Sequence, residues 1–202
     1  MSIANYFTFI RIFISPIFLL VYMEHDLIGI SNTLLPYVLL FLMGVSELSD
    51  IFDGFLARRY NQVTDLGKIF DPMADSISRI SVFLTFTLAP VNLHMLLVFV
   101  FLYRDSVVST LRTICALRGF ALAARTSGKV KAVIQAVTAF FITILMIPHS
   151  LGYLSTQDLH LWSTIAVFIA GVYTVYSGFD YIYANRQHVK KVLTLPPLKK
   201  QA

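Results

Sequence analysis

The chain contains few charged residues and a single cysteine. Of its 202 residues, 13% are charged and 57% are hydrophobic. Soluble domains have roughly a quarter of their residues charged, so this balance excludes an ordinary soluble protein and indicates an integral membrane protein. Cys115 lies in an apolar run and can form no disulfide within the chain, so cysteine usage does not indicate an oxidising compartment.

The sequence also lacks internal repeats, low-complexity tracts and any sign of a second domain. We therefore expect one membrane domain over residues 1–202, with a basic tail over residues 186–202. The first apolar segment carries Arg11 near its start and has no small-residue cleavage site behind it. It is expected to remain as a membrane span, because a signal peptide would show such a site.

Apolar segments of membrane-spanning length recur six times. A helix needs about 20 residues to cross a bilayer, and the pattern predicts an all-α integral membrane protein with six transmembrane helices. The helices are expected at residues 6–23, 34–57, 66–88, 93–117, 130–147 and 161–183. Pro16 is compatible with a kink in the first helix. Arg104, Asp105 and Arg112 are too polar to face lipid, so they should point into the bundle.

Three connections contain no lysine or arginine, namely residues 24–33, 90–92 and 148–160. Cytoplasmic loops carry an excess of these residues. Both termini and the connections after Arg58 and Arg118 are therefore expected in the cytoplasm. The basic tail is interpreted as a topology signal with weak contact to anionic headgroups. Because the positive charges are dispersed along this membrane surface without interleaved aromatics, we expect no nucleic-acid partner.

Five aspartates lie between residues 50 and 75, which we call the signature stretch, and four of them fall in pairs at helical spacing. Asp50 and Asp53 lie one helical turn apart, and Asp71 and Asp75 repeat this arrangement on the next predicted helix. If the two helices pack as a hairpin, the four carboxylates face each other. Such close like charges require a cation between them or partial protonation. The cluster therefore predicts a cation site that opens toward the cytoplasm.

The signature stretch contains no cysteine and no histidine. This excludes the usual ligands of zinc and copper and favours a hard cation such as magnesium, manganese or calcium. Gly54 and Gly67 leave room beside the acids for a bulky ligand. A proton relay or ion pathway is an alternative, as is a divalent-cation carrier. Carrier sites usually lie near the membrane midplane, whereas these acids lie near helix ends.

From Asp50 to Asp75 the pattern DxxDGxxARx8GxxxDxxxD resembles the complete signature of the CDP-alcohol phosphotransferases. The resemblance implies that family's membrane fold and a reaction in which a CDP-linked lipid transfers its phosphatidyl group to an alcohol and CMP leaves. By position it implies two Mg²⁺ or Mn²⁺ ions, with Asp75 also acting as general base. The implied metal ligands are Asp50, Asp53, Asp71 and Asp75. The implied CDP-binding residues are Asn5, Asp50, Asp53, Gly54, Ala57, Arg58, Gly67 and Asp71.

A looser resemblance extends to the phosphatidylglycerophosphate synthase branch of that family. It rests on an N-x2-T-x2-R-x4-P pattern from Asn5 to Pro16 and on an R-D…L-R…R-G…G-K-x-K pattern within residues 104–135. This implies CDP-diacylglycerol as donor, glycerol 3-phosphate as acceptor and a homodimer among membrane lipids. Ser76 departs from the branch, many members of which have lysine after the last aspartate. Serine or an inositol phosphate therefore remain alternative acceptors.

A set of cations follows the signature stretch in the chain. A phosphate dianion drawn from water needs several charge-assisted hydrogen-bond donors. We expect the acceptor phosphate to bind among Arg112, Arg118, Lys129 and Lys131. The alternative is that these charges only set the topology of the chain.

Overall fold

The computed structural model describes residues 3–59, 65–118, 122, 125–187 and 189–190. Within these ranges the side chains of residues 3–9, 51, 53–59, 65–72, 116 and 117 are not described. Most of the predicted basic tail, residues 186–202, therefore lies outside the described residues.

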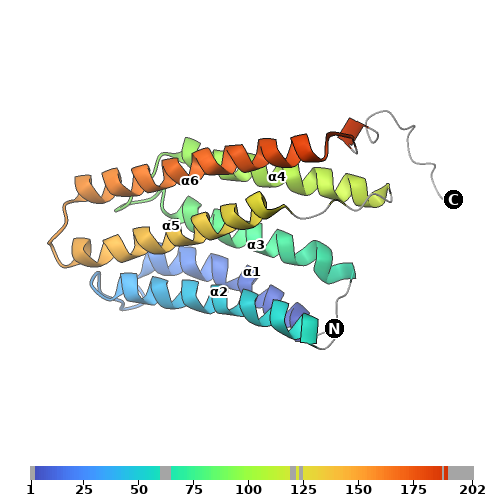
Figure 1. Cartoon of the computed structure of the whole chain (residues 1–202). Coiled ribbons are helices and arrows are strands. Elements are labelled where there is room, and N and C mark those ends of the chain that lie inside the picture. Colours follow the sequence, from blue (N-terminus) through green and yellow to red (C-terminus); the bar gives the residue numbers. More distant parts are fainter. Residues whose placement is uncertain (1–2, 60–64, 119–121, 123–124, 188, 191–202) are drawn as a thin grey trace.

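The described residues form six α-helices, which confirms the predicted all-α fold (Figure 1). The helices are α1 Ile3–Glu24, α2 Leu35–Arg59, α3 Asp65–Thr85, α4 Met95–Leu117, α5 Thr126–Ser150 and α6 Thr156–Ala184. Pro16 lies inside α1 without ending it. The helix α6 begins earlier than predicted, because Ser155 caps it by accepting a hydrogen bond from the Asp158 backbone at 3.0 Å.

Consecutive helices run in opposite directions in an elongated bundle (Figure 1). The start of α1 and the end of α6 therefore lie at the same end of the molecule, together with the ends of the helices that carry the signature stretch. We call this the signature half. The helix α1 packs against both α2 and α3, α5 packs against α6 and α2, and α4 packs against α6 and α3.

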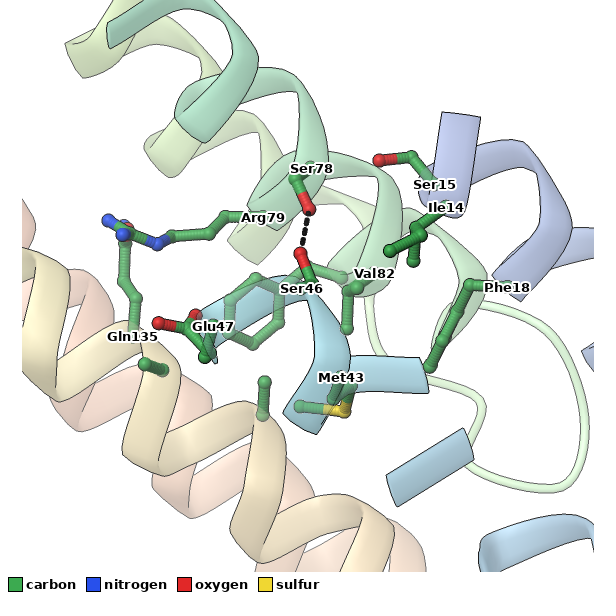
Figure 2. Close-up of a pocket in the computed structure, with 13 residues that line it drawn as sticks. Ile14, Ser15, Phe18, Met43, Ser46, Glu47, Ser78, Arg79, Val82 and Gln135 are labelled. Carbon is green, nitrogen blue, oxygen red and sulfur yellow. Dashed lines mark hydrogen bonds between the residues drawn. The ribbon is translucent and has the colours of Figure 1, made fainter. Parts of the chain in front are cut away.

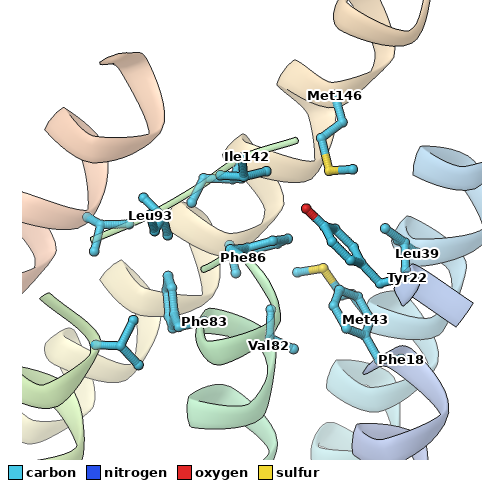
Figure 3. Close-up of a cluster of buried hydrophobic side chains, with 14 of the residues drawn as sticks. Phe18, Tyr22, Leu39, Met43, Val82, Phe83, Phe86, Leu93, Ile142 and Met146 are labelled. Carbon is cyan, nitrogen blue, oxygen red and sulfur yellow. The ribbon is translucent and has the colours of Figure 1, made fainter. Parts of the chain in front are cut away.

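The opposite half contains the hydrophobic core (Figure 3). Phe86 of α3's carboxyl-terminal extension is fully buried, and its ring lies edge-on to Phe18 and Tyr22 at centroid distances of 6.1 and 6.3 Å. Phe83 continues this packing to Phe101 of α4 at 4.8 Å. Aromatic rings in these orientations add specific attraction to the burial of apolar area. We call this region the apolar half.

The outer surface is also strongly apolar. The helices α5 and α6 are long and apolar enough to cross a membrane, within the part of the chain that the structure describes. Large apolar side chains are exposed on all six helices, including Phe13, Phe41, Ile77, Leu96, Val137 and Phe168. Soluble monomers rarely expose so much apolar surface. The chain is accordingly a membrane protein, and the number of its helices that cross the membrane remains a prediction.

Candidate active site

A buried arginine joins the first and last aspartates of the signature stretch. Arg11 of α1 is 2% exposed, and its Nη1 donates a hydrogen bond to Oδ1 of Asp50 on α2. The same nitrogen lies 3.7 Å from Oδ1 of Asp75 on α3. The predicted convergence of these two carboxylates is therefore present. The helix α1 brings the two carboxylates together, since both α2 and α3 pack against it.

Asp75 has a second arginine partner on its own helix. Arg79 lies one turn further along α3, and its Nη2 donates a hydrogen bond to Asp75 Oδ1 at 2.7 Å. The Asp75 side chain is 33% exposed and the Arg79 side chain 14%. Asp75 is thus partly accessible while its arginine partner is largely enclosed.

Glu47 adds a third carboxylate that the sequence prediction did not include. It lies one helical turn before Asp50 on α2, and its strongest electrostatic partner is Arg79. Charges of opposite sign therefore alternate through the signature half in the order Glu47, Arg79, Asp75, Arg11 and Asp50. We call this series the charge chain. Alternation lets ionic groups remain inside a bundle where isolated charges would be unfavourable.

A small pocket lies beside the charge chain (Figure 2). Its polar side is formed by Ser46 and Glu47 of α2, Ser78 and Arg79 of α3, and Gln135 of α5. The hydroxyl oxygens of the two serines lie 3.4 Å apart and connect α2 to α3. The space inside is about 30 Å³, enough for one or two water molecules and too small for a nucleotide.

Other predicted site residues have side chains outside the described ones. These are Asn5 in α1, Asp53, Gly54, Ala57 and Arg58 in α2, and Gly67 and Asp71 in α3. Their backbones are helical, which confirms the predicted one-turn spacing of the aspartates on each helix.

Asp53 and Asp71, two of the four predicted metal ligands, have side chains outside the described ones. Among the described side chains, no group of three or more carboxylate, histidine or cysteine residues forms a candidate metal site. Asp50 and Asp75 are the two members of the predicted ligand set that are described. Both offer carboxylate oxygens, which fit a hard cation such as Mg²⁺ or Mn²⁺. The four-aspartate metal site remains a prediction.

The predicted acceptor residue Lys131 is held by a carboxylate. Its Nζ donates hydrogen bonds to both oxygens of Asp105 on α4, at 2.7 and 2.9 Å. Asp105 also accepts from Arg104 at 3.1 Å and from the Ser76 hydroxyl at 3.4 Å. This buried cluster connects α4 and α5 to the residue that follows Asp75. The expectation that Arg104 and Asp105 point into the bundle is confirmed.

The other three predicted acceptor residues lie in different surroundings. Arg112 donates a hydrogen bond to the Tyr181 hydroxyl at 3.5 Å, and its guanidinium carbon lies 5.6 Å from that ring's centroid. Arg118 follows the end of α4 and is half-buried, whereas Lys129 is exposed in the first turns of α5. Both belong to the signature half. Binding of a phosphate by these four residues remains a prediction.

Arg104 lies close to glycines of α5 and α6, and only Gly178 of α6 is approached more tightly than an ordinary side-chain contact. A Cβ at Gly178 would lie 3.1 Å from Arg104 Cγ, and one at Gly128 would lie 3.5 Å from its Nη2. Nearby, Arg125 donates to Asp180 at 2.9 Å and Ser127 donates to the same carboxylate at 2.5 Å. These contacts fix the start of α5 against the end of α6.

Sequence reasoning did not assign Glu47, Arg79 or Asp105 to the site. A signal existed for the first two, because Glu47 precedes Asp50 by one helical turn and Arg79 follows Asp75 by one. Asp105 is different, since its partner Lys131 lies on another helix. Its contact with Lys131 depends on how the bundle places α4 relative to α5, which spacing along the chain does not reveal.

Comparison with known proteins identifies a family and several relatives that match this chain over most of its length. A model of the CDP-alcohol phosphatidyltransferase family matches residues 1–176. A Bacillus subtilis protein is 29% identical over 198 residues, covering 94% of this chain and 97% of its own. A Rickettsia felis protein is 29% identical over 187 residues, covering 93% and 97%. A Mycoplasma genitalium protein is 28% identical over 203 residues, covering 94% and 86%. All three are named CDP-diacylglycerol–glycerol-3-phosphate 3-phosphatidyltransferase.

Proposed function

Because the chain belongs to the CDP-alcohol phosphatidyltransferase family, we propose that it transfers the phosphatidyl group of CDP-diacylglycerol to glycerol 3-phosphate. The products are phosphatidylglycerophosphate and CMP. The names of the three relatives support this donor and acceptor. The observation that carries the proposal is the convergence of Asp50 and Asp75 on Arg11, because it joins both ends of the signature stretch in one site.

In this proposal Asp50, Asp53, Asp71 and Asp75 hold divalent cations, with Mg²⁺ or Mn²⁺ as the expected metals and two as the expected number. Carboxylate oxygens are the ligands these cations prefer. When bound, the cations neutralise the negative charge that develops on the pyrophosphate oxygens. The absence of histidine and cysteine from the signature stretch supports a hard cation.

Asp75 is the proposed general base. It accepts the proton of the acceptor hydroxyl while that oxygen forms a bond to the β-phosphorus and the bond from this phosphorus to the CMP oxygen breaks. The partial exposure of Asp75 supports this role, because an acceptor has to reach the carboxylate. The nucleotide is proposed to lie against Gly54, Ala57 and Gly67, with Asn5 and Arg58 as polar partners.

The acceptor phosphate is proposed to bind among Arg112, Arg118, Lys129 and Lys131. The cluster of Lys131, Asp105 and Ser76 supports this location, because it brings the start of α5 toward Asp75. Since Asp105 neutralises Lys131, we assign little of the phosphate affinity to Lys131. Lys131 then acts mainly by anchoring α5 to α4.

We further propose that all six helices cross the membrane, with the active site and both termini in the cytoplasm and two chains forming a homodimer. Exposed apolar side chains on each helix support six crossings. The loops at the apolar end that connect α1 to α2, α3 to α4 and α5 to α6 carry no lysine or arginine. This charge distribution supports a cytoplasmic signature half.

Release of CMP by purified protein tests the proposal. The protein in detergent micelles is given CDP-diacylglycerol with glycerol 3-phosphate, serine or inositol phosphate as separate acceptors. We expect CMP release with glycerol 3-phosphate. Faster release with serine or inositol phosphate would overturn the acceptor, and absence of release with every acceptor would overturn the reaction class.

A further inference from the structure

Arg79 connects Asp75 to a part of the bundle outside the signature stretch. One side of its guanidinium donates to Asp75 Oδ1 at 2.7 Å. Glu47 of α2 lines the same small pocket as this arginine. An arginine guanidinium is planar and offers several donors in a fixed arrangement, so it can engage two acids at once. Arg79 therefore contacts Asp75 on one side and lies beside Glu47 of α2 in the pocket on the other.

The two arginines of the charge chain constrain Asp75 from different helices. Arg79 contacts Asp75 Oδ1 from the same helix, α3. Arg11 belongs to α1, and its Nη1 lies 3.7 Å from the same oxygen. Two cations on one carboxylate oxygen restrict rotation of that side chain. Because Arg11 and Arg79 are 2% and 14% exposed, these contacts are screened by water far less than surface ion pairs are.

The remaining side of Arg79 faces the small pocket (Figure 2). Figure 2 shows Arg79, Glu47 and Gln135 directed toward the same side of that pocket. Among the described residues, Arg79 Nε and Gln135 Oε1 are buried without a hydrogen-bond partner. A donor and an acceptor beside a space for one or two waters make a suitable site for a bridging water. Such a water would link Arg79 to Gln135 of α5, beside Glu47 of α2 in the same pocket.

We infer that Arg79 is a positioning residue for Asp75 and that Glu47 keeps Arg79 in place. The inference rests on the proposed role of Asp75 as general base. Arg79 itself touches no reacting atom in this account. It fixes the carboxylate in the orientation in which it receives the acceptor proton, and misplacement of a catalytic group by about 1 Å can lower turnover by about 10²-fold.

The kinetic test compares R79Q, R79K and E47Q with wild type. We expect R79Q to lower kcat by about 10- to 100-fold and to leave KM for CDP-diacylglycerol within about threefold. R79K should recover most of the lost kcat, because lysine can also pair with an acid one helical turn away. E47Q should give a smaller loss of kcat than R79Q.

A matched control is R186Q, which removes an exposed arginine at the end of α6. It should keep the wild-type kcat. A wild-type kcat in R79Q would overturn the inference, as would an R79K enzyme no faster than R79Q. A loss confined to KM for CDP-diacylglycerol would overturn it too, because Arg79 would then bind the donor.

A second readout does not depend on activity. The unfolding midpoint of the metal-free protein is measured for wild type, R79Q, D75N and the double variant. If the pair holds as described, the double variant loses less stability than the two single losses added together. Additive losses would overturn the inference. If the wild-type enzyme released no CMP, the proposed function would fail, while this cycle would still decide whether Arg79 restrains Asp75.

Discussion

The apolar half and the signature half of the bundle are stabilised by different physical means. In the apolar half, Phe86 packs edge-on against three other aromatic rings, and the contacts are attractive over a range of orientations (Figure 3). In the signature half, buried groups such as Arg11, Asp105 and Lys131 depend on specific partners of opposite charge. Loss of one such partner leaves the other charge buried and uncompensated.

This difference separates stability from chemistry. Apolar packing and the buried Lys131–Asp105 pair hold the helices together, whereas the charge chain sets where Asp50 and Asp75 lie. Substitutions in the apolar half should therefore lower the unfolding midpoint and leave kcat nearly unchanged. Substitutions in the charge chain should lower kcat and have a smaller effect on the unfolding midpoint than those in the apolar half.

The D75N variant should give the largest loss of activity. A general base typically contributes about 10²- to 10⁴-fold to turnover, and asparagine cannot accept the proton. We expect kcat to fall by that amount while KM for CDP-diacylglycerol changes little, as measured by CMP release at saturating metal. If donor affinity falls as much as kcat, Asp75 acts chiefly as a metal ligand.

The K131M variant tests the buried ion pair with Asp105. Removing one partner of a buried pair costs about 3–5 kcal/mol, whereas replacing both partners with apolar residues is often nearly neutral. We therefore expect K131M to lower the unfolding midpoint and the double variant K131M/D105L to recover much of it. If the double variant is no more stable than K131M, the loss in K131M does not come from leaving Asp105 buried without its partner.

The F86A variant tests the apolar half. Truncating a buried phenylalanine costs about 3 kcal/mol or more of stability through lost burial and a residual cavity. We expect a lower unfolding midpoint and an unchanged kcat per folded molecule at a temperature where the variant remains folded. Loss of kcat in fully folded F86A would show that the two halves are not independent.

The R118A and K129A variants test the acceptor pocket and should have the smallest effects on the enzyme as a whole. Each hydrogen bond to a charged group contributes about 1.5–3 kcal/mol, so one lost contact should raise KM for glycerol 3-phosphate by about tenfold or more. KM for CDP-diacylglycerol should remain unchanged. Wild-type KM values for both substrates in both variants would place the acceptor phosphate elsewhere.

Much of the fold follows from local features of the sequence. The six helices were predictable because each apolar segment is long enough for a span and is bounded by polar or proline-containing turns. The early start of α6 was missed because four of the five residues 156–160 are polar, and the Ser155 cap supplies the missing helix signal. Helix identity depended on hydrophobicity, whereas this boundary depended on a single hydrogen bond.

The site was predictable to the extent that its residues lie in one stretch of chain. The spacing of Asp50 and Asp75 indicated a shared site, and Arg11 confirms that these two carboxylates converge. The partner of Lys131 was not predictable, because Asp105 reaches it only through the arrangement of the whole bundle, in which α4 and α5 each pack against α3 and α6. Long-range ion pairs depend on which faces of two helices meet, and hydropathy does not specify this.

We propose that the signature half carries out metal-dependent phosphatidyl transfer to glycerol 3-phosphate. The most direct measurement follows label from glycerol 3-phosphate into lipid, alongside CMP release, for wild type and D75N in the presence of Mg²⁺ or Mn²⁺ and in excess chelator. We predict equal amounts of labelled lipid and CMP from the wild type with metal, and almost none from D75N or in chelator. Undiminished transfer in excess chelator, or CMP release without label entering lipid, would contradict the account.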